Sequence, residues 1–435
     1  MNFKDETRLD GGIKLKDNED IFAVLIGIHK EVADLDICCE HLDELASLAH
    51  TFGLTKLQKV PCRMQKIKAS TFLHSKKIEE IADLLKAQKG QLVIFDEEIS
   101  PAQQRNLEKI LRVAVMDRTE LILEIFAQRA QTKEAQLQIE LARTTYAFPR
   151  LKRLWSHLSR QRASGGYLKG EGEKQIEIDR RLLKERFKRL SKDLQKVQIY
   201  RQTQGHARRR SGIPTFAIIG YTNAGKSTLL NALTQANVLV ENKLFATLDP
   251  TTRKFILPNK QEVLLTDTVG FIRKLPHTLI AAFRSTLEIA LHDDVLIHLI
   301  DVSHPLAEEH AKTTRTLLKE LNAKEDAIIT VLNKIDCCNH PQIIDRLRMS
   351  YSKVVLISAK KMTNFNELAQ MMMDELAEKR RIVKLRIPQS EYALVTTLRR
   401  EGNVLYEEYE ENDVILRAEI PIKLFNLFEG YLSAD

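Results

Sequence analysis

The sequence lacks three features, and their absence narrows its class. No apolar run approaches the roughly 20 residues that a helix needs to span a bilayer. The chain has five cysteines, whose odd number and spacing fit neither a disulfide framework nor a zinc site. Its first residues are polar and carry both charges, unlike a secretory signal. We therefore expect a protein of the reducing cytoplasm, without a membrane span.

The composition is that of a folded protein with several domains. Hydrophobic residues make up 43% of the chain and charged residues 29%, which is ordinary for globular protein. At 435 residues, the chain is long enough for about two to four domains that each bury a core. We expect a multidomain α/β fold and a monomer when the chain is free.

The stretch 220–227 has the pattern of a phosphate-binding P-loop, and it follows the apolar run 215–219. Gly220 and Gly225 allow the backbone to turn so that successive N–H groups point at phosphate oxygens. Lys226 supplies a positive charge to the β- and γ-phosphates, and the Ser227 hydroxyl is placed to coordinate Mg²⁺. The pattern predicts binding of a nucleoside triphosphate. The residues of this loop are Gly220, Tyr221, Thr222, Asn223, Ala224, Gly225, Lys226 and Ser227.

A second pattern indicates which base is bound. The segment Asn333, Lys334, Ile335 and Asp336 follows the apolar run 327–331, so it lies where ligands collect in doubly wound sheets. An aspartate can accept both the ring N–H and the exocyclic amine of guanine, and adenine lacks this donor pair. The sequence therefore favours GTP over ATP. A further strand-and-loop pattern ends in Ser358, Ala359 and Lys360, whose backbone N–H groups are candidates for the guanine O6.

An apolar strand at 263–266 ends in Asp267, Thr268, Val269 and Gly270. Asp267 is expected to hold Mg²⁺ through water, and the Gly270 N–H to contact the γ-phosphate. Lys226 and Gly270 are thus the candidate catalytic groups. The next residue is Phe271, where many small GTPases have a glutamine that orients the attacking water. Hydrolysis is therefore expected to be slow until another group or a partner positions the water.

The first switch segment must supply a threonine ligand for Mg²⁺. Thr247 lies twenty residues after Ser227 and twenty before Asp267, and we prefer it to Thr251 and Thr252. The alternative role of those two is in a turn or a helix cap. The candidate nucleotide-binding residues of this segment are Phe245, Ala246, Thr247, Leu248 and Asp249.

The positive charge of the chain is concentrated in one segment. Residues 150–210 contain 19 Lys and Arg against 6 Asp and Glu, whereas the whole chain has a net charge of +8. Such a concentration indicates a phosphate-rich partner, although charge runs usually form a solvated helix face. Helical spacing of apolar residues in 117–158 and 173–202 predicts an antiparallel helical hairpin.

The tip of this hairpin carries cations, glycines and one aromatic residue, a combination suited to RNA. The candidate RNA-contact residues are Arg162, Gly165, Gly166, Tyr167 and Lys169.

The remaining segments complete four predicted parts. Strands at 21–27 and 91–95, with helices at 40–50 and 77–88, predict a small α/β domain. The acidic run 96–98 there is expected to be a solvated turn before a helix that enters at Ser100 and Pro101. The predicted parts are an N-terminal α/β domain (1–117), the basic hairpin (118–210), a doubly wound P-loop GTPase domain (211–381) and a small α+β domain (382–435).

Several long motifs resemble those of the HflX family of ribosome-associated GTPases, a translation-factor class. They lie at 44–53, 93–107, 175–181, 220–227, 245–251 and 267–271, so the resemblance covers nearly the whole chain. It implies a Mg²⁺-dependent GTPase that binds the large ribosomal subunit and its RNA and splits stalled ribosomes. It also implies that the hairpin loop approaches the peptidyl-transferase region.

The chain departs from the family pattern in the hairpin loop, where Lys169, Glu171 and Lys174 replace the Arg, Pro and Thr of the family. Losing proline loosens the loop, and Glu171 adds a charge that RNA repels. Two other functions stay open: an RNA chaperone or remodeller, and a nucleotide-dependent scaffold in which hydrolysis is incidental, since Phe271 leaves the site without an obvious water-positioning group. ATP use at another site is a further possibility, since Asn333 and Asp336 concern only the GTP site.

Overall fold

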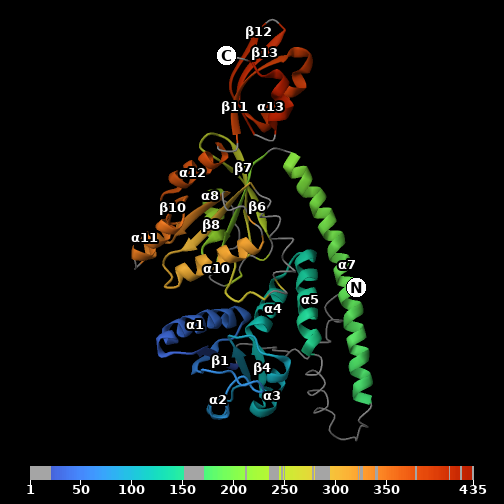
Figure 1. Cartoon of the computed structure of the whole chain (residues 1–435), viewed down its shortest axis with the longest axis vertical. Helices are drawn as coiled ribbons and strands as arrows, with labels where there is room; N and C mark the ends of the chain where they lie inside the picture. The colour runs from blue at the N-terminus through green and yellow to red at the C-terminus, as the bar shows by residue number, and fades with distance from the viewer. Residues whose placement is uncertain are drawn as a thin grey trace. The chain divides into compact units, whose positions relative to one another are not determined.

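The structure is a computed structural model (Figure 1). It describes residues 21–150, 171–210, 213–234, 244–245, 248, 250–276, 279, 294–321, 323, 327–338, 341–377, 380–410, 412–421 and 424–433. The chain forms two compact units. The first contains residues 1–197 with the short segments 242–248 and 274–283, and the second contains 198–241, 249–273 and 284–435. The predicted division into four parts stays a prediction.

The first unit is built on a parallel four-stranded sheet in the order β2-β1-β3-β4. Its strands are β1 (Phe22–His29), β2 (Lys56–Arg63), β3 (Leu92–Phe95) and β4 (Ala114–Asp117). The helices that accompany them are α1 (Leu35–Phe52), α2 (Ser75–Ala87), α3 (Pro101–Leu111) and α4 (Arg118–Arg129). The central strands β1 and β3 are almost completely buried, as continuous apolar runs require in a sheet covered on both faces.

One detail of this unit differs from the sequence-based expectation. Asp96 was expected in a solvated turn, but its side chain is buried and its carboxylate bonds to Arg118 at 2.8 Å. Lys274 also contacts Asp96, at 3.2 Å, and Glu97, at 2.5 Å. The physical reason is that Arg118, itself almost fully buried, needs carboxylate partners to offset its desolvation. The predicted helix start is confirmed, since Ser100 caps α3 and Pro101 is its first residue.

The predicted first arm of the hairpin is divided into two helices, α4 and α5 (Lys133–Ala147). Thr132 caps α5 by accepting a bond from the Ala135 N–H, which explains the break. The second arm is the helix α7 (Glu171–Arg210), 40 residues long. An ion pair between Arg186 and Glu140 joins α7 to α5, so the hairpin pairing is present within the described residues.

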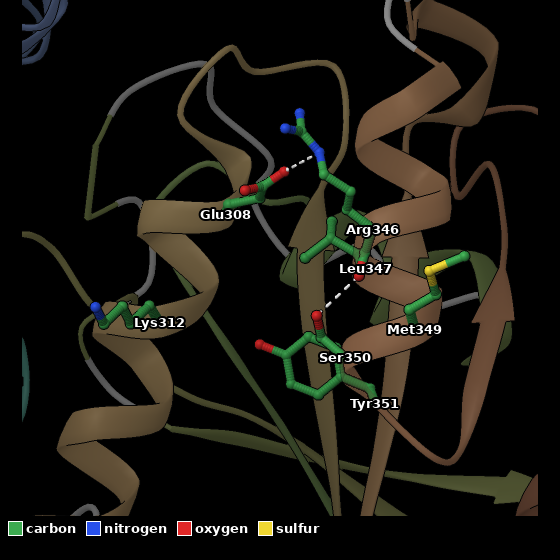
Figure 2. Close-up of a pocket in the computed structure, with 7 residues that line it drawn as sticks. All are labelled: Glu308, Lys312, Arg346, Leu347, Met349, Ser350 and Tyr351. Carbon is green, nitrogen blue, oxygen red and sulfur yellow. Dashed lines mark hydrogen bonds and ion pairs between the residues drawn. The ribbon is translucent and has the colours of Figure 1, made fainter.

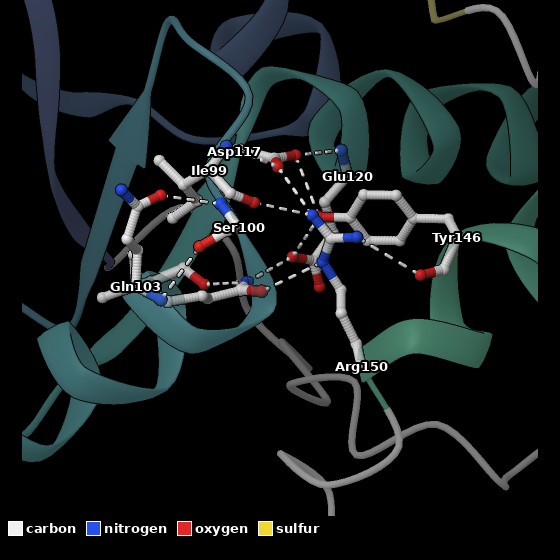
Figure 3. Close-up of polar contacts among 9 residues, drawn as sticks. Ile99, Ser100, Gln103, Asp117, Glu120, Tyr146 and Arg150 are labelled. Atoms are coloured by element: carbon white, nitrogen blue, oxygen red, sulfur yellow. Dashed lines mark hydrogen bonds and ion pairs between the residues drawn. The ribbon is translucent and has the colours of Figure 1, made fainter. Parts of the chain in front are cut away.

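A buried polar network ties the end of α5 to the sheet (Figure 3). The Arg150 guanidinium donates to the Ile99 carbonyl at 2.8 Å, to Gln104 at 3.2 Å and to Asp117 at 3.3 Å. It also lies 3.6 Å from the centroid of the Tyr146 ring, whose hydroxyl donates to Asp117. Strand β4 and helices α3 and α5 are therefore held together by charge and hydrogen bonds as well as by apolar packing.

The second unit contains a six-stranded sheet in the order β10-β9-β8-β5-β7-β6, in which only β6 runs antiparallel (Figure 1). The strands are β5 (Thr215–Gly220), β6 (Thr251–Ile256), β7 (Glu262–Asp267), β8 (Val295–Asp301), β9 (Ile328–Asn333) and β10 (Val354–Leu356). The helices are α8 (Lys226–Thr234), α10 (Ala307–Glu320), α11 (Pro341–Ser350) and α12 (Phe365–Ala377). This is the predicted doubly wound architecture.

The sheet is covered on both faces, because side chains of one strand alternate between two apolar clusters. Ile297 and Leu299 of β8 belong to the cluster with α8 and α12, whereas Ile300 belongs to the cluster with α10 and α11. Strand β5 lies between β7 and β8, so its carboxyl end opens at the point where the strand order reverses. The P-loop starts at this point.

The C-terminal part of the second unit is a three-stranded antiparallel sheet with helices, as the α+β prediction requires. Its elements are β11 (Arg380–Pro388), α13 (Tyr392–Glu401), β12 (Asn403–Glu410), β13 (Asp413–Pro421) and the short α14 (Phe425–Phe428). The preceding helix α12 ends at Ala377, and β11 begins at Arg380. Within the described part of the chain, no helix is both long and apolar enough to cross a bilayer.

Candidate nucleotide-binding site

The P-loop follows β5 and leads directly into α8, as the sequence predicts. Gly220 has a φ of +154°, and a Cβ there would lie 2.3 Å from the Leu299 carbonyl oxygen. Gly225 has a φ of +98°, and a Cβ there would lie 2.5 Å from the Asn333 side-chain nitrogen. Both positions therefore require glycine, since any larger residue would meet backbone or a buried amide.

The Lys226 amine lies inside this loop. It donates to the Tyr221 carbonyl at 2.8 Å and to the Gly220 carbonyl at 3.2 Å. Burial lowers the pKa of Lys226 to about 8, against the opposite effect of the Asp267 carboxylate. A buried ammonium gains strongly from an anion, so the amine is suited to bind phosphate.

The P-loop also has a buried polar atom with no partner. In the part of the chain that the structure describes, Thr222 Oγ1 is buried and makes no hydrogen bond. Such an atom costs free energy unless a ligand or water satisfies it. Together with the buried ammonium of Lys226, it fits a loop built around an anion.

Two predicted ligands of Mg²⁺ lie next to each other. The Ser227 hydroxyl donates to Asp267 Oδ2 at 2.6 Å, although the two residues are 40 positions apart. Hydroxyl and carboxylate oxygens are the donors that Mg²⁺ prefers, so this pair fits the ion. Thr247, the third predicted ligand, lies outside the described residues, as do Ala246 and Asp249.

The segment after Asp267 lies against the P-loop through backbone bonds. The Thr222 N–H donates to the Phe271 carbonyl at 2.7 Å, and the Phe271 N–H donates to the Gly220 carbonyl at 3.0 Å. A Cβ on Gly270 would lie 2.9 Å from Lys226 Nζ. Phe271 is buried, so its side chain packs in the interior instead of facing a water molecule. Thr268 is also buried and donates to the Ile218 carbonyl.

Asn333 braces the loops of the site. Its side-chain nitrogen donates to the Ala224 carbonyl at 2.8 Å, and its oxygen accepts from the Ala359 N–H at 2.9 Å. One side chain thus joins the P-loop to the 358–360 loop. Within the predicted nucleotide site, Asn333 therefore holds the backbone of two loops in place.

Asp336 is the residue predicted to recognise the base. A hydrogen bond from Ser358 is the main cause that holds the pKa of the Asp336 carboxyl below its usual value, and Cys337 and Lys361 act in the same direction. The carboxylate is therefore ionised at neutral pH and accepts hydrogen bonds only. This is the state that can accept the two donors of guanine.

Sequence reasoning missed the partner of Lys334. The Lys334 amine contacts Asp301 Oδ2 at 2.6 Å, while the Lys334 backbone is left-handed with a φ of +65°. Asp301 also accepts from the hydroxyl and N–H of Ser303, which fixes its orientation. Its signal in the sequence was an acidic residue at the end of the apolar run 295–300, next to a strand that carries site residues.

Phe245 belongs to the first unit by its contacts. Its ring packs edge-on against Phe126 with centroids 4.4 Å apart, and its carbonyl accepts from Arg129 at 3.1 Å. Leu248 is also buried. The predicted first switch segment is therefore anchored on both sides of Thr247 by buried apolar side chains.

The five candidate RNA-contact residues lie outside the described residues; they are Arg162, Gly165, Gly166, Tyr167 and Lys169. Helix α7 is described, and it exposes a series of basic side chains. These are Arg181, Lys184, Lys188, Arg189, Lys192 and Lys196. Its buried residues, Leu183, Leu190 and Leu194, have helical spacing and oppose this basic surface.

A cavity of about 420 Å³ lies elsewhere in the second unit, between α10 and α11 (Figure 2). Among the residues that line it, Glu308 and Arg346 form an ion pair at 2.8 Å, and Tyr351 also lines it. None of its lining residues belongs to the predicted nucleotide site.

Three family models match successive parts of the chain. They are described as GTP-binding GTPase N-terminal (residues 39–127), GTP-binding GTPase middle region (129–208) and 50S ribosome-binding GTPase (215–334). Together they extend over most of the sequence.

Individual relatives agree with these matches. The GTPase HflX of Chlamydia pneumoniae is 50% identical over 423 residues, which cover 96% of this chain and 89% of that protein. The GTPase HflX of Escherichia coli K12 is 39% identical over 403 residues, covering 92% and 93%. Among solved structures, a GTP-binding protein of Sulfolobus solfataricus in complex with GDP is 26% identical, with a TM-score of 0.44, and covers 82% of this chain and 99% of that one.

Proposed function

Because the chain belongs to the HflX family of GTPases, we propose that it uses GTP to bind the large ribosomal subunit and to split stalled ribosomes. It binds GTP and hydrolyses it to GDP and phosphate. One observation carries the ribosomal part of the proposal. A phosphate-binding loop with a guanine-type recognition residue lies in the same chain as the 40-residue helix α7, which exposes basic side chains.

The ribosomal partner is assigned from the positive charge of α7 and from the family of the chain. A positive helix neutralises phosphates and releases their counterions, which favours any nucleic acid. One matching family model is described as a 50S ribosome-binding GTPase, which selects the large ribosomal subunit among nucleic-acid partners. The protein would then act in the cytoplasm, as a monomer when it is not on the ribosome.

Mg²⁺ is the metal that we assign to the site. Ser227 would coordinate the ion directly and Asp267 would hold it through water, with Thr247 as the further ligand. The ion neutralises charge that develops on the phosphates during transfer. Lys226 holds the β- and γ-phosphates, and the Gly270 N–H binds the γ-phosphate.

The nucleotide state sets how firmly the protein holds the ribosome. While the γ-phosphate is present, its contacts with Gly270 and Thr247 keep both switch segments ordered. Hydrolysis removes those contacts. The affinity for the ribosome changes only as far as the two nucleotide states differ in their free energy of binding to it. A tenfold change in affinity requires a difference of about 1.4 kcal/mol.

Co-sedimentation with isolated large subunits tests whether the bound nucleotide controls the affinity for the ribosome. We expect tighter binding with a non-hydrolysable GTP analogue than with GDP, by about tenfold or more. The matched control is Asp336→Asn, which replaces one of the two carboxylate oxygens that accept from guanine with an NH₂ group, and this group can donate to the C2 oxygen of xanthine. The variant should lose the response to the GTP analogue and regain it with the xanthosine analogue.

Equal binding of the wild-type protein with GDP and with the GTP analogue would show that the nucleotide does not control the affinity for the large subunit. Ribosome splitting is measured separately, by the loss of 70S particles in a sucrose gradient after addition of protein and GTP. If large subunits are bound but 70S particles persist, the splitting part of the proposal is wrong and the binding part stands.

A further inference from the structure

We propose that the Tyr221 hydroxyl is a positioning group for GTP hydrolysis, because it holds the backbone that follows Gly270 against the P-loop. The hydroxyl oxygen accepts a hydrogen bond from the Arg273 N–H at 2.7 Å. Tyr221 lies in the P-loop and Arg273 lies 52 residues later, three residues after Gly270. A side chain of the loop that binds phosphate thus fixes the segment that senses the γ-phosphate.

This bond extends a short backbone pairing between the two segments. Tyr221 and Phe271 form an isolated parallel bridge, made by the Thr222 N–H and the Phe271 N–H. The pairing reaches only as far as Phe271. The Tyr221 hydroxyl adds a contact two residues further on and so restrains the direction in which the segment leaves the site.

The ring of Tyr221 is itself fixed. It is 5% exposed and stacks on the His310 ring, with centroids 3.7 Å apart and an interplanar angle of 5°. The ring centroid of His310 in turn lies 4.5 Å from that of His304, and the Nδ1 atom of His304 accepts a hydrogen bond from the Leu306 N–H. A ring packed in this way cannot turn its hydroxyl away from Arg273 without losing the stack. The bond is therefore formed at little cost in side-chain entropy.

The bond keeps Gly270 close to the P-loop. A Cβ on Gly270 would lie 2.9 Å from Lys226 Nζ and 2.9 Å from the Thr222 Cα, so Gly270 is already against the P-loop. A γ-phosphate bound to the Lys226 amine is then within reach of the Gly270 N–H. Holding Arg273 stabilises this arrangement before the γ-phosphate arrives and through the transition state. The diphosphate makes no contact with Gly270, so its affinity does not depend on the Tyr221 hydroxyl.

The substitution Tyr221→Phe tests the proposal, because it removes the hydroxyl and keeps the ring and its stack. Loss of one hydrogen bond between neutral groups predicts a fall of about fivefold in single-turnover GTP hydrolysis. The affinity for the non-hydrolysable GTP analogue should fall with it, while the affinity for GDP should stay within about twofold. Hydrolysis is measured without ribosomes, so the result is independent of the proposed ribosomal function.

The matched control is Tyr351→Phe, which removes a hydroxyl from the same unit at the cavity between α10 and α11. It should leave hydrolysis and both affinities unchanged. A second variant, His310→Leu, removes the stack and keeps the hydroxyl, and it should lower hydrolysis with unchanged GDP affinity. Unchanged hydrolysis in Tyr221→Phe would overturn the proposal. A parallel loss of GDP affinity would also overturn it, since the hydroxyl would then support the P-loop as a whole.

Discussion

At the scale of single residues, the candidate site separates side chains that are predicted to contact GTP or Mg²⁺ from side chains that hold backbone. Lys226, Ser227 and Asp336 are of the first kind, and their residue types alone predict contacts with phosphate, Mg²⁺ and guanine. Asn333 belongs to the second, because both ends of its amide bond to backbone at Ala224 and Ala359. Its partners lie 109 and 26 positions away, so the sequence placed Asn333 at the site without showing which groups it holds.

The buried amine of Lys226 predicts that GTP binding is coupled to proton uptake. Burial lowers the pKa of Lys226 to about 8 in the nucleotide-free protein, and bound phosphates favour the charged amine and raise that pKa. GTP binding therefore takes up a proton above pH 8 and takes up almost none near pH 6.5. Affinity should fall as the pH rises above about 8, by up to about tenfold for each pH unit.

Titration calorimetry in two buffers of different ionisation enthalpy measures this uptake directly. The buffer dependence of the binding enthalpy should appear at about pH 8.5 and be nearly absent at about pH 7, because the amine is already charged there. Phosphates of the free nucleotide are fully ionised at the higher pH and contribute no proton. Equal enthalpies in both buffers at the higher pH would show that Lys226 is already protonated.

At the scale of elements, several of the predicted strands were recognised by continuous apolar runs. Strands β1, β3 and β5 are central and buried, so their residues are apolar at nearly every position. Strand β2 was not predicted, because it is the edge of its sheet and exposes half of its side chains. Strand β4 was also missed, since its four residues leave too short a pattern to separate from the helix that follows.

The network around Arg150 predicts how β4, α3 and α5 are held together. Replacing Arg150 with Met keeps much of the volume but leaves the Asp117 carboxylate and the Gln104 amide oxygen buried without their charged donor. Breaking a buried pair in this way costs about 3 kcal/mol. Amide hydrogen exchange in β4 and the start of α4 should accelerate by about a hundredfold.

The control for this prediction is a pair on the surface. Asp83 and Lys86 form an ion pair in which both side chains are 78% exposed. Asp83→Asn should change the exchange of neighbouring amides by less than about threefold, since exposed pairs contribute little. If Arg150→Met behaves like this surface variant, the network does not stabilise the junction.

At the scale of the whole molecule, the compact units do not follow the order of the sequence. The first unit includes the short segments 242–248 and 274–283, which flank nucleotide loops in the chain. Phe245 packs on Phe126, and Lys274 bonds to Asp96 and Glu97 within that unit. Charge is also unevenly distributed, since residues 150–210 carry 19 Lys and Arg against 6 Asp and Glu.

Reversing charge on α7 should weaken binding to the large subunit, because the helix would then neutralise fewer phosphates of the ribosomal RNA. Lys184, Lys188 and Lys192 are exposed at four-residue spacing, so they lie along one face of the helix. Replacing all three with Glu should lower affinity and reduce the slope of log affinity against log salt by about 2 to 3. GTP hydrolysis without ribosomes should be unaffected, because none of these residues lies in a nucleotide loop.

The matched control reverses three exposed cations of the second unit, Lys312, Lys319 and Arg348. The net charge changes equally, so a general electrostatic effect would weaken binding in both variants. Equal weakening in the two variants would mean that α7 is not a specific contact surface. The same salt titration with large subunits separates the two cases.

The sequence by itself determined the chemistry of the nucleotide loops. A P-loop works through the backbone of consecutive residues, so the stretch 220–227 specifies its own turn, charge and metal ligand without help from elsewhere. The same holds for the ends of long apolar strands, where Asp267 and Asp336 are placed by the strand that precedes each.

Only the tertiary structure decided which of these loops meet and which side chains hold them. The contacts of the Tyr221 hydroxyl with Arg273, of Asn333 with Ala224, and of Ser227 with Asp267 join residues 40 to 109 positions apart. They exist because the strand order places β5 between β7 and β8 and brings the carboxyl ends of parallel strands to one edge. Strand order depends on packing free energy summed over the whole sheet, and no local pattern records it.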